Sequence, residues 1–342
     1  MLLSIIIPVY NSAPYLQKCL DSIISQSFID YEVLMIDDGS SDDSGDIIDS
    51  YSHKDSRFHA YHKTNEGVSA ARNMGIDYAL GSYIYFMDSD DYLVQTALEK
   101  MVQAIENDYD FVSFNFKIED EKGHKISNSI YQDKEISLNS KDQLLKFLLR
   151  DYMTHKYGWE PWNRLYRRDI IEKNRLRFPP KLNLGEDFAF TLCYLFYVKK
   201  YKIISDTLYI YVQHQGSITN VLKDKYNLKK PLIQNSYILS YCNETLILNN
   251  WPPFFVKILD MEVSKLRRIN LSHNRISKML KAELSDREIN LMKNYLHSRH
   301  FARLVGVNNY TRLQYYTKLY LNGGKRIYCI FEFILFKLFS KA

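Results

Sequence analysis

Three aspartates follow a run of strand-forming aromatic residues in the stretch YIYFMDSDDYL, at positions 88, 90 and 91. Carboxylates this close repel one another unless a positive charge lies among them. The i, i+2 spacing of Asp88 and Asp90 suits Mg²⁺ or Mn²⁺, which commonly takes one or two protein carboxylates and completes its shell with phosphate oxygens and water. A solvated turn is the alternative, because Asp and Ser are also ordinary turn residues.

The segments that must hold these acids alternate between strands and helices. Mostly apolar runs without alternation at residues 3–10 and 31–38, the second ending in Asp37 and Asp38, are typical of strands buried on both faces, and helical spacing of leucine and isoleucine lies between them. The pattern continues with a helix at about 42–52, a strand near 57–62, a helix at 68–79, a strand at 82–88 and a helix at about 94–107. It predicts an α/β fold with a mostly parallel sheet, whose ligands bind beyond the carboxyl ends of the strands.

The composition limits the class of protein. The 342 residues include 45 Lys and Arg against 40 Asp and Glu, and no dense basic run marks a nucleic-acid arm. Four cysteines lie far apart with no CxxC pair, which indicates neither a zinc site nor a disulfide framework and fits a reducing compartment. The N-terminal apolar run lacks a positive n-region and a cleavage site, so we interpret it as a strand and not as a signal peptide.

Other ligand motifs fail on spacing. If Gly45 took position 6 of an EF-hand loop, Tyr51 would occupy position 12, where Glu is required. The first strand runs into PVYNSAPY without GxGxxG, and no P-loop pattern occurs. His59 and His62 would face opposite sides of a strand, which favours surface histidines over a metal cluster.

Four segments in register resemble the nucleotide-sugar-binding half of family 2 glycosyltransferases, which are inverting enzymes with the GT-A fold. They are SIIIPVYN (4–11), VLMIDDGSSDDS (33–44), NEGVSAARNMG (65–75) and YIYFMDSDDYL (83–93). The likeness continues less sharply through WNRLYRRDII (162–171), GEDFAF (185–190) and YIYVQHQGSIT (209–219). It implies a Rossmann-like, mostly parallel sheet flanked by helices, and an enzyme of the bacterial surface-polysaccharide type that uses a UDP-sugar.

The resemblance assigns the uracil ring to the loop after the first strand, at Pro8, Val9 and Tyr10. An aspartate that matches Asp37 or Asp38 hydrogen-bonds the uracil imide in such enzymes, and a carboxylate suits this contact because uracil N3 is a donor. Two alternatives stay open: Tyr10 packs in the core, or Asp38 only builds the turn.

The resemblance also assigns Asn65, Gly67 and Arg72 to the segment that approaches the donor diphosphate. A glycine lets the backbone come close, a helix N-terminus favours anions, and a guanidinium neutralises phosphate charge. The plain alternative for Arg72 is a surface position on a helix.

The DxD motif of the family corresponds to Asp88, Ser89 and Asp90. By that match Asp88 lies near the ribose and the metal, and Asp90 ligates the Mn²⁺ or Mg²⁺ that bridges the two phosphates. His214 resembles the C-terminal metal-ligating histidine of many GT-A enzymes, although a single His is as often structural. We expect Asp91 to cap the next helix.

GEDF resembles the ED motif of the family, which makes Asp187 the general base for the acceptor hydroxyl and gives Glu186 a role in orienting the acceptor or the loop. The alternative is that both acids form ion pairs with nearby basic residues, namely Arg164, Arg167, Arg168 or Lys181.

Trp159, Trp162 and Asn163 precede the proposed base and are candidates for an acceptor platform. An indole offers a flat apolar face to a sugar ring, but tryptophans are more often core residues, so core packing is the alternative.

Residues 1–220 are expected to form the GT-A domain, with a nucleotide-sugar half at about 1–115 and an acceptor half at about 116–220. The polar segment 119–142 predicts a hairpin or a mobile loop, and residues 221–342 predict a mostly helical C-terminal region.

The basic, largely apolar tail at 325–342 is too short to span a bilayer. It predicts a helix that lies in an anionic membrane interface or packs in a homodimer. The membrane alternative implies a lipid-linked saccharide acceptor and a cytoplasmic enzyme at the inner face of the cell membrane.

Two rival functions are a nucleotidyltransferase and a non-catalytic nucleotide-sugar-binding module. The GEDF motif argues against the first, and the intact acids Asp88, Asp90 and Asp187 argue against the second.

Overall fold

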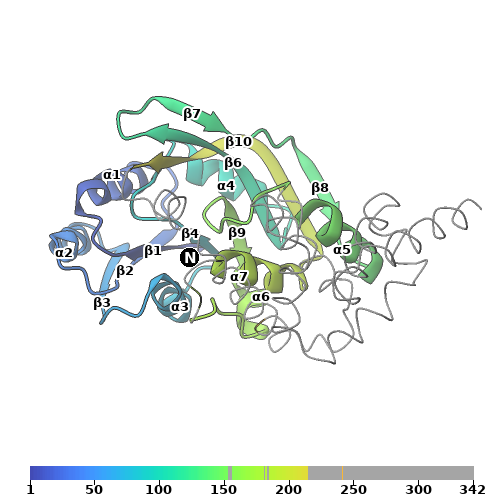
Figure 1. Cartoon of the computed structure of the whole chain (residues 1–342), viewed down its shortest axis with the longest axis horizontal. Coiled ribbons are helices and arrows are strands. Elements are labelled where there is room, and N and C mark those ends of the chain that lie inside the picture. The colour runs from blue at the N-terminus through green and yellow to red at the C-terminus, as the bar shows by residue number, and fades with distance from the viewer. Residues whose placement is uncertain (153–155, 181, 183–184, 215–240, 242–342) are drawn as a thin grey trace, which may run out of the picture. The chain divides into compact units, whose positions relative to one another are not determined.

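The structure of the chain, a computed structural model, describes residues 1–152, 156–180, 182, 185–214 and 241 (Figure 1). The chain divides into two compact units, one of Met1–Asn139 and Tyr157–Tyr226 and the other of Ser140–Lys156 and Asn227–Ala342. The tail at 325–342, and all of 221–342 except Tyr241, lie outside the described residues, so the sequence-based domain limits stay predictions. Within the described part of the chain, no helix is long and apolar enough to cross a membrane.

The first hundred residues alternate strands and helices, as the periodicity predicts. In order the elements are β1 Leu3–Val9, α1 Ala13–Ile24, β2 Tyr31–Asp37, α2 Ser44–Lys54, β3 Phe58–His62, α3 Val68–Tyr78, β4 Tyr83–Phe86, β5 Tyr92–Leu93 and α4 Ala97–Ile105. Every residue of β1 and β2 is buried, which explains why their sequences are mostly apolar and show no alternation. Strand β5 has only two residues, too few to give a periodic signal.

The later elements are less regular. They are β6 Phe111–Asp120, β7 Lys125–Asn128, β8 Lys134–Ser137, α5 Lys141–Phe147, the π-helical turn η1 Leu148–Tyr152, β9 Arg164–Arg167, α6 Arg168–Lys173, α7 Glu186–Leu195 and β10 Lys200–Gln213. Strands β6 and β7 pair antiparallel, which confirms the hairpin in the polar segment 119–142. Helix α5 and η1 belong to the second unit.

The strands form a single sheet in the order β3-β2-β1-β4-β9-β6-β10-β5, with β7 beside β6 and β8 beside β10 (Figure 1). Strands β3, β2, β1 and β4 are parallel, as are β6 and β10, whereas β9 runs antiparallel between β4 and β6. The α/β fold is therefore confirmed. The parallel strands β1 to β4 lie in the half of the domain that is predicted to bind the nucleotide-sugar.

Successive residues of β1 serve the two faces of the sheet. Ile5 and Ile7 belong to a core cluster that also contains Leu20 of α1 and Leu98 of α4. Ile6 points to the other face, where a Cβ atom at Gly75 of α3 would lie 2.3 Å from Ile6 Cγ2. The missing side chain thus lets α3 pack directly on the sheet. This close packing fixes the helix that carries Arg72.

Candidate active site

The carboxyl ends of β1, β2 and β4 bring candidate residues to one edge of the sheet. Val9 ends β1 and pairs with Asp37 at the end of β2, and the Asp38 amide donates to the Val9 carbonyl at 2.8 Å. Asp88 follows the end of β4, which lies on the other side of β1. The parallel strand order thus places both acidic pairs at the same edge.

The proposed uracil loop contains two buried residues and one exposed residue. Pro8 and Val9 are buried in β1, so they can meet a nucleotide only through the main chain. Tyr10 is 55 % exposed, and the alternative that it packs in the core is wrong. Its ring is the one in this trio that can stack on a base.

Asp37 is already hydrogen-bonded within the protein. It accepts from the Ser40 amide at 2.9 Å and lies 3.0 Å from Nδ1 of His62, whose Nε2 lies 3.0 Å from Asp49. Burial raises the pKa of Asp37, but the hydrogen bonds from Ser40 and His62 outweigh it and hold the pKa below its usual value. Asp37 is therefore an ionised carboxylate at the end of β2, and its hydrogen bonds fix its orientation.

Asp38 organises the loop that precedes α3. Its carboxylate accepts from Lys63 Nζ at 2.7 Å and from the amides of Glu66 and Gly67 at 3.0 and 2.7 Å. These three donors fix the loop that carries Asn65 and Gly67, whereas the turn after β2 is bridged by the Ser40 amide, which donates to Asp37. The uracil contact of Asp38 stays a prediction. Asn65 is exposed, and Gly67 has φ 92° with open space where a Cβ would lie. That conformation favours glycine and leaves room at the start of α3.

Arg72 is the centre of an acidic cluster. It is only 3 % exposed, so the alternative of a surface position is wrong. One terminal nitrogen, Nη1, donates to Asp187 at 2.6 Å and lies 3.8 Å from Glu186, and the other, Nη2, donates to Asp88 at 3.0 Å. The guanidinium thus joins the proposed donor-side acid to both acids of the GEDF motif. The predicted phosphate contact of Arg72 stays a prediction.

Helix α7 begins with the two acids of GEDF. Gly185 has φ 87° and precedes the helix, so Glu186 and Asp187 occupy its first turn. The basic partner of these acids is Arg72. The residues named in the alternative have other contacts: Arg167 pairs with acidic residues at 108, 110 and 169, Arg168 donates to the Gly81 carbonyl, and Arg164 donates to the carbonyls of residues 157 and 158. Lys181 lies outside the described residues.

Burial dominates the protonation of both GEDF acids. It raises the pKa of Asp187 to about 8, because the carboxylates of Glu186 and Asp88 add to burial and together outweigh the opposing charge of Arg72. Burial also raises the pKa of Glu186, whose Oε2 has no hydrogen-bond partner in the described part of the chain. Asp187 thus has the raised pKa expected of a general base that works near neutral pH.

Asp90 and His214 come together from distant parts of the chain. His214 follows β10, and its Nε2 lies 2.8 Å from Asp90 Oδ2. The imidazole stacks on the Tyr15 ring of α1 with centroids 4.5 Å apart, and the Tyr15 hydroxyl donates to Glu121 at 2.8 Å. Two of the three residues predicted as metal ligands, Asp90 and His214, are therefore neighbours.

The cluster as a whole has a negative excess. Asp88, Asp90, Glu186 and Asp187 contribute four carboxyl groups, and Arg72 is the guanidinium in contact with three of them. When these carboxyl groups are ionised they repel a diphosphate, and a divalent cation would offset that charge. Asp88 Oδ2 makes no hydrogen bond or ion pair with the described residues, and carboxylate oxygens with one imidazole suit Mn²⁺ or Mg²⁺. No group of three or more acidic, His or Cys side chains among the described residues forms a ready metal site, so the predicted metal stays a prediction.

Two residues of the DSDD turn support the loop from inside. The Ser89 side chain is buried and its hydroxyl donates to Ser12 Oγ at 2.8 Å, so it does not face a nucleotide. Asp91 is 1 % exposed and accepts from the Val212 amide of β10 at 2.7 Å and from the Tyr209 hydroxyl. The expected helix cap at Asp91 is wrong, because Asp91 anchors the strand that ends just before His214.

We expect Tyr209→Phe to lower the free energy of unfolding by about 1–3 kcal/mol, because it leaves a buried Asp91 oxygen without its donor. The hydroxyl also accepts from the Asp88 amide at 3.3 Å, so the variant should lose affinity for divalent cations as well. Urea unfolding measures the first effect. Tyr78→Phe is the control, since Tyr78 is 44 % exposed and should change stability by less than about 0.5 kcal/mol. Equal effects of both substitutions would contradict the anchoring role.

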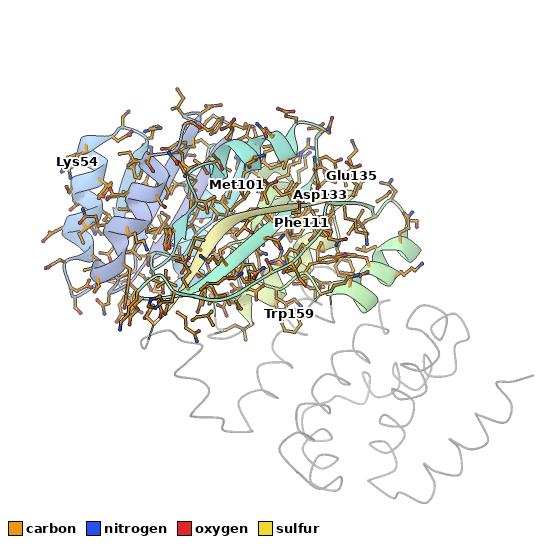
Figure 2. All side chains as sticks on the ribbon, turned by 90° about the horizontal axis from the view of Figure 1, so that it is seen from above. Lys54, Met101, Phe111, Asp133, Glu135 and Trp159 are labelled. Atoms are coloured by element: carbon orange, nitrogen blue, oxygen red, sulfur yellow. The ribbon has the colours of Figure 1, made fainter. Side chains whose placement is uncertain are left out.

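Of the three residues proposed for the acceptor platform, two are buried in the core and one lies near the proposed base. Trp162 is 6 % exposed and its ring stacks on Tyr209 with centroids 4.6 Å apart, and Asn163 is fully buried and donates to the Phe114 carbonyl at 3.3 Å. Both are core residues, so their assignment to an acceptor platform is wrong. Trp159 packs edge-on against Phe188 of α7, next to the proposed base. It lies at the margin of the described side chains (Figure 2).

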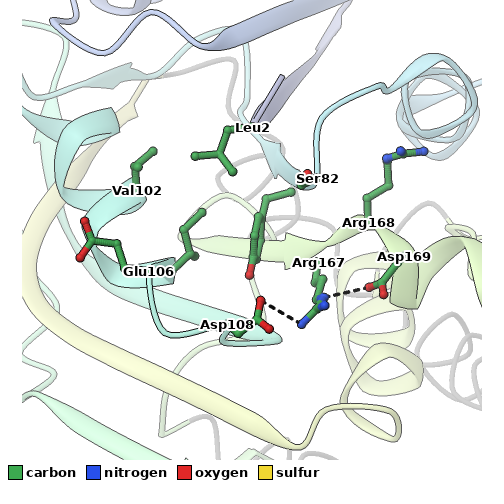
Figure 3. Close-up of a pocket in the computed structure, with 10 residues that line it drawn as sticks. Leu2, Ser82, Val102, Glu106, Asp108, Arg167, Arg168 and Asp169 are labelled. Carbon is green, nitrogen blue, oxygen red and sulfur yellow. Dashed lines mark ion pairs between the residues drawn. The ribbon is translucent and has the colours of Figure 1, made fainter.

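A pocket of about 460 Å³ lies at the opposite edge of the sheet (Figure 3). It is bordered by residues at the beginnings of the parallel strands and by neighbouring helix ends, including Leu2, Ser82, Glu106, Arg167 and Arg168. None of the predicted site residues lines it.

Sequence reasoning missed the supporting residues. Tyr15 stacks on His214, and Tyr209 hydrogen-bonds the acidic turn from 118 or more positions away, and neither belongs to a motif that marks such a contact. The alternation in YIYV predicts only that Tyr209 and Tyr211 share a face of their strand.

Comparisons with known proteins agree with this geometry. The family model "Glycosyl transferase family 2" matches residues 4–175. The chain is 30 % identical to the uncharacterized glycosyltransferase EpsJ of Bacillus subtilis over 260 residues, covering 72 % of this chain and 73 % of EpsJ. It is 26 % identical to the glycosyltransferase GlyG of Streptococcus pneumoniae, covering 95 % of this chain and 98 % of GlyG.

A solved structure shares the fold. The crystal structure of S. aureus TarS residues 1–349 in complex with UDP-GlcNAc matches with a TM-score of 0.63 at 22 % identity, over 94 % of this chain and 92 % of that one.

Proposed function

The chain belongs to glycosyltransferase family 2, and we propose that it transfers a sugar from a UDP-sugar to a saccharide by a single displacement that inverts the anomeric centre. The sugar is a hexose or an N-acetylhexosamine. The acceptor is a lipid-linked saccharide of a bacterial capsule, cell wall or other surface glycan, and the enzyme works at the inner face of the membrane. The UDP-GlcNAc complex of the TarS structure supports UDP as the nucleotide.

The observation that carries this proposal is the contact of one buried arginine with both an acid of DSD and an acid of GEDF. Because Arg72 donates to Asp88 and to Asp187, the two acids lie within the span of one guanidinium. A donor diphosphate near Asp88 would therefore present its sugar close to Asp187. This proximity is what a single displacement requires.

In the proposed reaction, Asp187 accepts the proton of the acceptor hydroxyl as that oxygen forms a bond to C1 of the sugar. The bond from C1 to the diphosphate oxygen breaks at the same time, and UDP leaves with the electron pair. Glu186 orients the acceptor, and Tyr10 stacks on the uracil. When bound by Asp88, Asp90 and His214, Mn²⁺ or Mg²⁺ supplies a Lewis acid that offsets the charge on UDP.

Calorimetric titration of UDP, first with Mn²⁺ and then with EDTA, tests the donor, and a panel of UDP-sugars with lipid-linked acceptors follows. We expect binding that requires the metal, and release of UDP when the acceptor is present. Release of pyrophosphate from a nucleoside triphosphate would instead indicate a nucleotidyltransferase. Metal-dependent UDP binding without turnover on any acceptor would favour a non-catalytic binding module.

The transfer rate is expected to rise with pH through the neutral range. Asp187 must be ionised to accept a proton, and its pKa is raised to about 8, so the active fraction falls about tenfold per unit below that value. A plot of log(kcat/KM) should therefore have a slope of about one between pH 6 and 7.5 and level off at higher pH. A flat profile in this interval would mean that Asp187 has an ordinary carboxyl pKa or is not the base.

A further inference from the structure

One guanidinium joins the two halves of the candidate site. We propose that Arg72 is a positioning residue that holds the base Asp187 on the donor-side acid Asp88, so that donor binding and placement of the base are energetically coupled. This inference rests on the function proposed above. It differs from a role of Arg72 in phosphate neutralisation alone, which would involve Asp88 and the donor but not Asp187.

The fork geometry of the arginine allows both contacts at once. Asp187 accepts from Nη1 and Asp88 accepts from Nη2, so neither acid displaces the other. Asp88 uses only Oδ1 for this bond. Its second oxygen, Oδ2, can contact the donor while Arg72 remains hydrogen-bonded to both acids. A lysine, with one ammonium nitrogen, lacks this rigid fork.

The surroundings hold the arginine in place. Its guanidinium carbon lies 5.2 Å from the centre of the Phe178 ring. The next residue, Asn73, makes two hydrogen bonds to the Phe178 backbone. Its side-chain Nδ2 donates to the Phe178 carbonyl at 2.8 Å, and its Oδ1 accepts from the Phe178 amide at 2.7 Å. Helix α3 packs on the sheet through Gly75. Arg72 is therefore held by a helix that packs on the sheet, and not by a loop.

A shared partner makes the two sites interdependent. Any change in the charge or position of Asp88 on donor binding alters how strongly Arg72 holds Asp187, and linkage requires that a change at Asp187 alter donor affinity to the same extent. Loss of the Asp187 charge also leaves more of the positive charge of Arg72 for the diphosphate. A base that served the acceptor independently would have no effect on UDP binding.

The test is a double-mutant cycle on UDP affinity, measured by calorimetry with UDP and Mn²⁺ on the full chain at about pH 8.5, where a pKa of about 8 leaves most of the Asp187 side chain ionised. We expect Asp187→Asn to tighten UDP binding about threefold or more in the wild-type background, and to have much less effect in the Arg72→Lys background. Arg57→Lys is the matched control, because Arg57 pairs with Asp55 outside the site and should leave UDP affinity unchanged. Thermal unfolding of each variant verifies the fold.

The outcomes separate the coupling from the function on which it rests. If wild-type protein binds UDP and Asp187→Asn changes the affinity equally in both backgrounds, or in neither, the coupling through Arg72 is refuted. If wild-type protein binds no UDP, with or without Mn²⁺, both the proposed donor and the proposed coupling are refuted. Should Arg72→Lys fail to fold, Asp88→Asn replaces it in the cycle, since it opens the other side of the bridge.

Discussion

Replacement of Asp187 by asparagine is expected to lower the rate of sugar transfer by about 10²–10⁴-fold, the usual contribution of a general base. The amide has nearly the same shape but cannot accept the proton of the acceptor hydroxyl. Because Arg72 can still donate to the amide oxygen, the variant should remain folded and should still bind UDP. The measurement is the initial rate of UDP release with a saturating donor and acceptor.

Two comparisons make this prediction specific. Glu186→Gln should reduce the rate less, because Glu186 orients and does not accept the proton. Asp77→Asn alters an exposed ion pair with Arg177 on the same compact unit and should leave the rate unchanged. Loss of UDP binding together with activity in Asp187→Asn would show that Asp187 supports the fold of the donor site instead of acting as the base.

Replacement of Asp90 by asparagine is expected to abolish the difference between UDP affinity measured with Mn²⁺ and with EDTA. Asp90 is the carboxylate paired with His214 at the proposed cation site, and a neutral amide is a much weaker ligand for a hard divalent ion. Loss of Lewis-acid assistance worth about 3 kcal/mol corresponds to a decrease of about a hundredfold in kcat.

His214→Ala provides a graded comparison for the Asp90 variant. It removes one neutral ligand and leaves both carboxylates of the DSD turn, so the Mn²⁺ dependence should weaken without disappearing. Calorimetry over a series of Mn²⁺ concentrations distinguishes the two. Full Mn²⁺ dependence of UDP binding in Asp90→Asn would mean that the cation is held elsewhere.

Local sequence was a good guide where local chemistry sets the structure. The strands β1 and β2 are buried on both faces, so most of their side chains are apolar, and their polar residues Ser4 and Glu32 hydrogen-bond each other. Their acidic ends follow from the parallel order, since every parallel strand then delivers its end to the same edge. The resemblance to family 2 rested on motifs in this region, and the family model matches it.

The same reasoning failed where two roles have the same local signature. Trp162 and Trp159 lie three residues apart, yet one is stacked in the core on Tyr209 and the other packs beside α7. Asp91 adjoins two proposed ligand-binding residues, yet it is a buried anchor for β10. Side-chain type does not distinguish these roles, because burial depends on segments that are distant in the chain, such as Tyr209, which lies 118 positions from Asp91.

The sequence by itself determined the α/β alternation, the edge that holds the acids and the family to which the chain belongs, because periodicity and motif spacing are properties of short segments. Only the tertiary structure decided which acids share a partner. Arg72 and Asp187 are separated by 115 positions, and no local pattern predicts that a helix packed through Gly75 would direct this guanidinium between Asp88 and the start of α7. That contact depends on how the helices pack on the sheet, and the packing involves the whole unit at once.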